Sequence, residues 1–141
     1  MQMNKGVKDW LAAAEAAVPR ISPEAARQMV AEHNALVVDV REAHELAESG
    51  KVDGAVHVSR GLLEFKADSD SPLHDENFRC DRVEILYCAA GGRSALAGMT
   101  LKEMGYVSVF NLGAFQDWVD SGGAIEGPDG PMRRTRRPDQ A

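Results

Sequence analysis

The sequence predicts a single α/β domain with a mostly parallel central sheet of about five strands and helices on both faces. One observation is that segments 35–40 (ALVVDV) and 83–87 (VEILY) are nearly continuous apolar runs containing β-branched residues. Runs of this kind are typical of strands buried on both faces. The second observation is that the expected strands alternate with helical segments, which is the order found when helices cover a parallel sheet.

The expected elements of the first half begin with an alanine-rich amphipathic helix over 8–18, which Pro19 ends. A second helix starts with Ser22 as its N-cap and Pro23 in its first turn, and it runs to about His33. The remaining elements of this half are the strand at 35–40, a short helix over 42–49 ended by Gly50, a strand over 55–58, a helical turn over 61–67 and a polar loop over 68–77.

The second half contains the strand at 83–87 and then a helix over 94–104, which is ended by Gly105. A fourth strand over 107–112 and a final helix over 114–120 complete the expected elements. The chain therefore divides into three predicted parts, which are a helical extension (1–18), a folded domain (19–126) and a flexible basic tail rich in proline and arginine (127–141).

Composition and charge restrict the classes of function. The chain has 141 residues, of which 44% are apolar and 27% charged, so it can build a sizeable core without disulfides or a structural metal. The net charge of −6 argues against nucleic acid as a partner, because an acidic body repels phosphate groups. The last ten residues differ from this body, since they contain four arginines and one acidic residue.

The N-terminus and the cysteine content indicate a cytoplasmic protein. Asp9 and Glu15 interrupt the first apolar run, so it lacks the form of a signal peptide. No segment approaches the roughly 18 apolar residues that span a bilayer, so no membrane partner is expected. Cys80 and Cys88 are too few for a disulfide framework or a zinc site. We interpret Cys80 as structural, with redox partnership with Cys88 as the alternative.

Segment 88–94 joins the strand at 83–87 to the helix that follows it. Cys88 stands at the carboxyl end of that strand, which is the edge where open α/β sheets bind ligands. Glycines let successive backbone N–H groups turn inward, and with a helix N-terminus these groups form a cradle for an anion. We interpret Cys88 as a nucleophile with a lowered thiol pKa rather than as an inert core cysteine. The predicted active-site loop consists of Ala89, Ala90, Gly91, Gly92, Arg93 and Ser94.

Cys88 to Ser94 resembles the active-site loop of rhodanese-like sulfurtransferases, which follows the pattern Cys-x-x-Gly-x-Arg-Ser/Thr. The resemblance extends over residues 20 to 123 and implies a rhodanese-like fold. Gly92 stands where a larger residue is common, which predicts a wider pocket mouth and a more mobile loop. The other matching stretches are Val38–Glu42 (the family's Asp-Val-Arg signature), Gly50–Val58 (its Gly-His-Ile-Pro-Gly-Ala run, with Lys51 and Asp53 in place of His and Pro) and Asn111–Trp118 (its Gly-Gly-x-x-x-Trp segment).

The resemblance implies sulfur transfer through a persulfide on Cys88. The thiolate would attack the outer sulfur of thiosulfate or of a low-molecular-weight persulfide, and cyanide or a thiol would then accept that sulfur in a ping-pong reaction. Such a reaction needs no metal and no organic cofactor. A protein persulfide donor is a further reading, which a wide pocket mouth at Gly92 favours.

Four other polar residues are candidates for supporting roles. Arg93 is expected to brace the loop from within, with binding of a donor's sulfonate as the alternative. Asp39 and Arg41 follow a buried strand and are expected to support the site structurally. Arg60 follows the strand at 55–58, so it is a candidate for attracting an anionic donor. His57 lies inside an apolar run and is interpreted as a core histidine.

Two rival functions come from other classes. A non-catalytic rhodanese-like module could bind or regulate a partner, although such modules often lack the cysteine that this chain retains. A phosphatase or arsenate reductase would also use a cysteine and an arginine around an anion. Loops of that kind place five residues between the two, whereas four residues separate Cys88 from Arg93.

Overall fold

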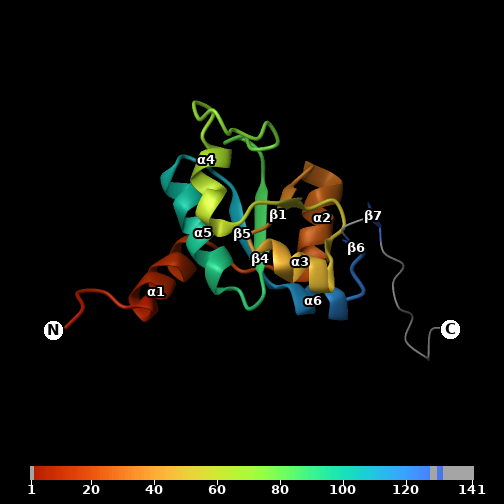
Figure 1. Cartoon of the computed structure of the whole chain (residues 1–141), viewed down its shortest axis with the longest axis horizontal. Helices are drawn as coiled ribbons and strands as arrows, with labels where there is room; N and C mark the ends of the chain where they lie inside the picture. The colour runs from red at the N-terminus through yellow and green to blue at the C-terminus, as the bar shows by residue number, and fades with distance from the viewer. Residues whose placement is uncertain (1, 128–129, 132–141) are drawn as a thin grey trace.

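The computed structural model describes residues 2–127 and 130–131 (Figure 1). Among these residues the central sheet has four parallel strands in the order β3-β1-β4-β5. The α/β class with a parallel sheet is therefore confirmed, with four strands where about five were expected. The strands are β1 (Leu36–Asp39), β3 (Val56–His57), β4 (Glu84–Cys88) and β5 (Val109–Ala114).

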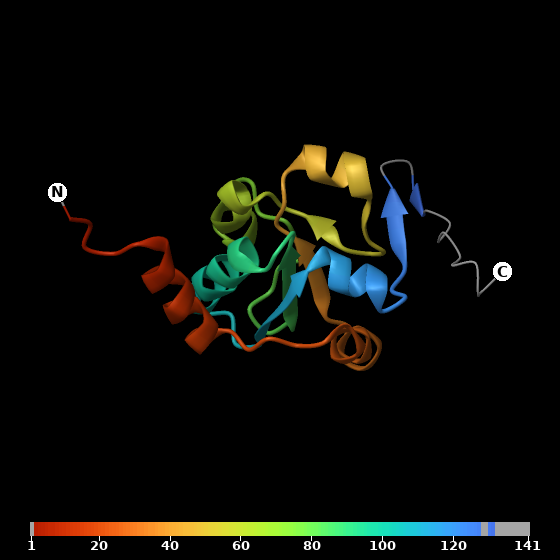
Figure 2. The same cartoon turned by 90° about the horizontal axis from the view of Figure 1, so that it is seen from below.

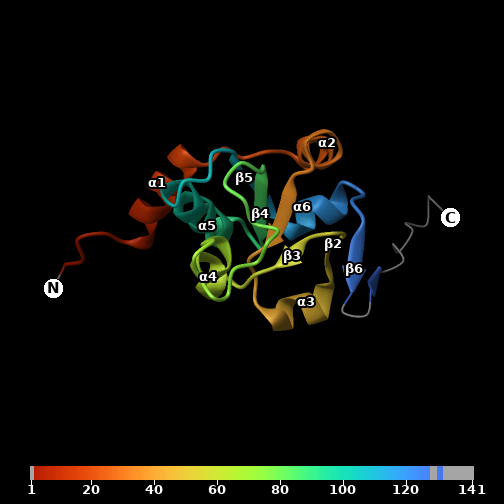
Figure 3. The same cartoon turned by 90° about the horizontal axis from the view of Figure 1, so that it is seen from above.

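Alternation along the strands directs side chains to two separate hydrophobic clusters, one on each face of the sheet. Val38, Leu86 and Cys88 belong to one cluster, whereas Val37 and Tyr87 belong to the other. Figures 2 and 3 show α1, α4 and α5 over one face and α2 and α6 over the other. These helices are α1 (Val7–Ala17), α2 (Pro23–His33), α4 (Leu63–Ala67), α5 (Gly92–Glu103) and α6 (Phe115–Asp120).

The expected helix starts are largely found, with shifts of one or two residues. The Ser22 hydroxyl accepts a hydrogen bond from Ala25 N at 3.1 Å, so Ser22 is the N-cap of α2 as predicted. α5 begins at Gly92, two residues before the expected start, because Gly91 takes the cap position with a φ of 106°. A short 3-10 turn, η1 (Arg60–Leu62), precedes α4.

The fold also contains a small antiparallel sheet that the sequence did not predict. It consists of β2 (Lys51–Val52), β6 (Ile125–Gly127) and β7 (Gly130–Pro131). Lys51 pairs with Glu126 across this sheet, and α3 (Ala43–Ser49) packs beside β6. The sheet crosses the predicted boundary at 126 and 127, while the rest of the predicted tail, 128–129 and 132–141, lies outside the described residues.

The segment after α1 runs along the free edge of β5. Ile21 N donates to the carbonyl of Asn111 at 3.0 Å, and Asn111 N donates to the carbonyl of Pro19 at 2.8 Å. Arg20 lies between these bonds and forms an isolated parallel bridge with Asn111. Pro19 has no N–H to continue a ladder, which limits this edge contact to a single bridge.

Candidate active site

Cys88 is the last residue of β4, and its side chain is 1% exposed. The chain turns at once into α5, and Gly91 N donates a hydrogen bond to Cys88 Sγ at 3.0 Å. The left-handed φ of Gly91 makes this turn possible, because L side chains rarely adopt such a conformation. Residues 88–94 thus wrap backbone N–H groups around the sulfur at the carboxyl edge of the sheet, as the sequence predicts.

Ser94 and Asn111 form a buried hydrogen-bond network with the Cys88 loop. Ser94 Oγ lies 3.4 Å from Cys88 Sγ and 2.7 Å from Asn111 Oδ1, and both side chains are buried. Asn111 Nδ2 donates to the Gly91 carbonyl at 3.1 Å, and Asn111 Oδ1 also accepts from Gly113 N at 2.9 Å. The Ser94 hydroxyl also lies 3.2 Å from the Gly91 carbonyl, and with one proton it can donate to only one of these three acceptors at any moment.

The hydrogen bonds decide the ionisation of the thiol. Burial acts to raise the pKa of Cys88, but hydrogen bonds from the Ser94 hydroxyl and from the backbone N–H groups of Ser94, Gly91 and Ala90 outweigh it. The pKa of Cys88 therefore lies below the ordinary value for a thiol. Hydrogen bonds that stabilise the charged form have this effect, and they favour a reactive thiolate.

Arg93 reaches toward α3. Its Nη1 and Nη2 atoms lie 2.8 and 2.9 Å from the two carboxylate oxygens of Glu45. The same carboxylate accepts a hydrogen bond from Glu42 N at 2.7 Å at the start of α3. Hydrogen bonding to Arg93 lowers the pKa of Glu45 to about 2. Arg93 is therefore bonded to α3, and its bracing role stays a prediction.

Asp39 and Arg41 form a buried ion pair beneath the site. Arg41 Nη2 lies 2.7 Å from Asp39 Oδ2, and the guanidinium also donates to the Gly50 carbonyl at 2.8 Å. The guanidinium packs over the rings of Phe115 and Tyr87, at 4.3 and 5.6 Å from their centroids. These contacts connect the end of β1 to α3 and α6, and the supporting role of the pair stays a prediction.

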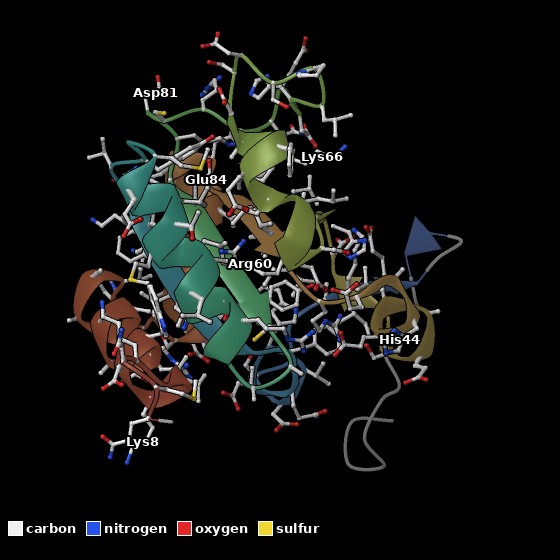
Figure 4. The ribbon with its side chains drawn as sticks, turned by 60° about the vertical axis from the view of Figure 1, so that its left-hand side comes forward. Lys8, His44, Arg60, Lys66, Asp81 and Glu84 are labelled. Atoms are coloured by element: carbon white, nitrogen blue, oxygen red, sulfur yellow. The ribbon has the colours of Figure 1, made fainter. Side chains whose placement is uncertain are left out.

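Arg60 and His57 are engaged elsewhere. Arg60 donates to Glu64 at 2.9 Å and to Thr100 Oγ1 at 2.9 Å, and Figure 4 shows it beside α5. Both contacts hold the Arg60 guanidinium outside the loop. They do not test whether Arg60 attracts an anionic donor, so that role stays a prediction. His57 Nε2 lies 2.7 Å from the Arg41 carbonyl, in line with the interpretation of a satisfied histidine.

Two expectations concern the surroundings of Cys88, namely the wider pocket mouth at Gly92 and the redox pairing of Cys80 with Cys88. Leu11 Cδ2 lies 3.7 Å from the position that a Cβ atom of Gly92 would take, which is ordinary van der Waals contact, and the wider pocket mouth stays a prediction. Cys80 is exposed and precedes the amino end of β4, whereas Cys88 ends that strand. The strand alone spans roughly 13 Å, which is too far for a disulfide within one chain.

Sequence reasoning missed Glu45 and Asn111. Glu45 is separated from Arg93 by 48 positions, so only the tertiary structure reveals that pair. A single asparagine inside an expected strand gives no chemical signal of its own. A β-bulge between β4 and β5 pairs Leu86 with Asn111 and Tyr87 with Gly113, so Leu112 is the extra residue. Bulges of this kind re-aim side chains next to active sites.

Residues 22–121 match the family model described as the rhodanese-like domain. The chain belongs to the rhodanese-like family. The match covers the Cys88 loop, the Asp39 and Arg41 pair and both residues that sequence reasoning missed. It leaves out α1 and the bridge at Arg20. Among the described residues, no helix is long and apolar enough to cross a membrane.

Curated relatives of this rhodanese-like chain carry names from sulfur chemistry. The thiosulfate sulfurtransferase GlpE of Actinobacillus succinogenes is 31% identical over 78% of this chain and 92% of its own length. YrkF of Bacillus subtilis, named as a candidate sulfur carrier, is 35% identical over 72% of this chain. The match covers 51% of YrkF, so the chain spans about half the length of that relative.

A solved structure from Rhodopseudomonas palustris has the same fold as this rhodanese-like chain. It superimposes with a TM-score of 0.80 at 32% identity, over 89% of this chain and 98% of that one. It is described as a protein of unknown function and possible tyrosine phosphatase. The superposition covers more of this chain than the family match does. The structural likeness therefore reaches beyond residues 22–121.

Proposed function

We propose that this rhodanese-like chain is a sulfurtransferase that carries sulfane sulfur as a persulfide on Cys88. The observation that supports this most directly is the placement of Cys88 Sγ, which accepts Gly91 N–H at 3.0 Å inside a loop of inward N–H groups. Such a loop stabilises a thiolate before the reaction and an anionic persulfide after it. The names of GlpE and YrkF agree with sulfur transfer and sulfur carriage.

The reaction has two balanced steps. In the first step the Cys88 thiolate attacks the outer sulfur of thiosulfate, the S–S bond of thiosulfate breaks, and sulfite leaves with the electron pair. In the second step a thiolate or cyanide attacks the terminal sulfur of the persulfide, and the Cys88 thiolate is released. Splitting the transfer in this way is nucleophilic catalysis with ping-pong kinetics. A low-molecular-weight persulfide can replace thiosulfate as the donor, with a thiolate as its leaving group.

The burial of Cys88 favours a donor with a slender reacting end. The residue is 1% exposed, and Leu11 fills part of the space beside Gly92. A terminal sulfur atom extends beyond the rest of its donor and can enter a narrow opening. Thiosulfate and small persulfides have this shape, so we rank them above a donor whose bulk must surround the cysteine.

The position of Arg93 argues against phosphatase or arsenate reductase chemistry. An arginine that binds an oxyanion must direct its guanidinium over the cysteine, whereas both terminal nitrogens of Arg93 bind Glu45. Four intervening residues also make a smaller ring than those enzymes use. Turnover of a phosphotyrosine analogue that is lost in Cys88→Ser would nevertheless replace our proposal.

The deciding experiment is the intact mass of the protein after incubation with thiosulfate and removal of excess reagent. We expect a gain of one sulfur atom in the wild type and in Cys80→Ser, and no gain in Cys88→Ser. Subsequent cyanide should remove the added mass and release thiocyanate. If neither thiosulfate nor glutathione persulfide loads the wild type, the chain is better explained as a non-catalytic binding module.

A further inference from the structure

Arg20 places its guanidinium directly against the Cys88 loop. A Cβ atom on Gly91 would overlap Arg20 Nη1, and one on Gly113 would lie 2.6 Å from Arg20 Cζ. Both glycines have left-handed φ values, 106° and 89°. The guanidinium therefore lies against Gly91 of the loop and against Gly113 of β5, which pairs with Tyr87. Neither the family match nor the loop motif includes Arg20.

Gly91 is the residue through which Arg20 acts on the sulfur. Its N–H donates to Cys88 Sγ at 3.0 Å, and its carbonyl accepts from Asn111 Nδ2 at 3.1 Å. Asn111 pairs in turn with the segment that carries Arg20, through the bonds of Pro19 and Ile21. Arg20 thus lies against the residue whose N–H binds the sulfur and whose carbonyl binds Asn111.

Arg20 also differs in charge balance from the other arginines near the site. Arg93 is paired with Glu45, Arg41 with Asp39 and Arg60 with Glu64. Within residues 2–127 and 130–131, no carboxylate is paired with Arg20. Standard bond lengths place its Nη1 no more than about 8 Å from Cys88 Sγ.

We infer that Arg20 is a positioning residue for the Cys88 nucleophile, supplied from outside the family match. It holds the Gly91 N–H on the sulfur and adds a positive charge that favours the thiolate and the anionic persulfide. A full charge at about 8 Å in a well-solvated setting shifts a pKa by roughly half a unit. The inference rests on the proposed role of Cys88 as nucleophile, but it does not require any particular sulfur donor.

The test is the pH dependence of Cys88 alkylation by iodoacetamide, measured in a Cys80→Ser background so that one thiol reacts. Arg20→Met keeps an unbranched apolar stem and removes the guanidinium with its charge. We expect it to raise the apparent thiol pKa by about half a unit and to slow alkylation at neutral pH about threefold. Arg20→Lys keeps the charge but cannot cover both glycines, so its apparent pKa should lie between those of the wild type and Arg20→Met.

Arg79→Met is the matched control, because Arg79 is an exposed arginine before the amino end of β4, far from the loop. If Arg20→Met shifts the thiol pKa no more than Arg79→Met does, the inference is wrong. If Arg20→Met does not fold, Arg20→Lys serves as the test. A Cys88 thiol pKa in Arg20→Lys equal to that of the wild type would then overturn the inference. Alkylation needs no sulfur donor, so a failure to load sulfur from thiosulfate would reject the proposed function without affecting this result.

Discussion

Arg93 and Glu45 form a bidentate ion pair, with Nη1 2.8 Å from Oε2 and Nη2 2.9 Å from Oε1. The pair joins the first turn of α5 to the first turn of α3, and it occupies both terminal nitrogens of the arginine of the family motif. Bidentate pairs of this kind fix geometry as well as adding energy. The loop is therefore held by a contact across two helices as well as by its own backbone.

Glu45→Gln should weaken this brace without removing the hydrogen bond to Glu42 N. We expect persulfide formation from thiosulfate to slow severalfold, because the start of α5 loses its link to α3. The free energy of unfolding should fall by only about 1 kcal/mol, since the Arg93 side chain is 37% exposed and water screens the pair. Sulfite release and urea unfolding measure the two effects.

The matched control for this variant is Glu48→Gln, which changes an exposed acid on the same helix. The pKa of Glu45 is lowered to about 2, so its contribution to stability is present above the ordinary glutamate pKa and is lost as the pH falls toward 2. The stability difference between wild type and Glu45→Gln should therefore be constant from pH 5 to 8 and shrink below pH 4. A difference that grows in acid would contradict the ion pair.

Ser94→Ala should raise the pKa of the Cys88 thiol, because the Ser94 hydroxyl is the side-chain donor at 3.4 Å from the sulfur. A hydrogen bond to a charged group contributes about 1.5–3 kcal/mol, so we expect a rise of roughly one unit. The alkylation rate against pH reports this shift. Ser94→Thr retains a hydroxyl and should restore most of the wild-type profile; an unchanged profile in Ser94→Ala would show that the backbone alone sets the pKa.

Glu84 makes the stability of the protein depend on pH. Its carboxylate is fully buried without a hydrogen-bond partner among the described residues, and burial raises its pKa to about 9. Figure 4 shows it among the helices that cover the sheet. The folded protein holds a proton that the unfolded chain releases above a pH of about 4.5, so stability should fall as the pH rises from about 5 to about 9.

Glu84→Leu should remove this dependence and raise the free energy of unfolding at pH 8 by a few kcal/mol, because it replaces an unpaired buried acid with an apolar side chain. Urea unfolding at pH 5 and pH 8 measures the effect. Glu103→Gln changes an exposed acid and serves as the control. A wild type that is more stable at pH 8 than at pH 5 would show that other groups dominate.

Two glycines of α5 should respond in opposite ways to alanine. A Cβ atom on Gly98 would lie 3.0 Å from both Cγ atoms of Val18, so Gly98→Ala overpacks the contact between α5 and the end of α1. Overpacking costs about 1–3 kcal/mol, which exceeds the gain of up to about 1 kcal/mol in helix propensity. The nearest atom to a Cβ on Gly92 is Leu11 Cδ2 at 3.7 Å, so Gly92→Ala should keep that gain. Equal stability of the two variants in urea would reject the close packing of α1 on α5.

Local sequence patterns account for much of the fold. The apolar runs of β1 and β4 and the cap at Ser22 depend on neighbours within a few residues, and both appear where they were expected. The strands of the small sheet have two or three residues each, so they carry no periodic signal. They form only because β6 pairs with β2. Elements of that size depend on partners far along the chain.

The α/β class and the place of Cys88 at the end of a buried strand follow from local sequence, because strand propensity and glycine placement are local properties. The side chains that surround that cysteine depend on tertiary packing. Glu45, Asn111 and Arg20 reach the loop from three other segments, and their contacts depend on how the helices and the sheet edge pack together. A charged or amide side chain has the same chemistry wherever it stands in the sequence, so its partner is set by the fold.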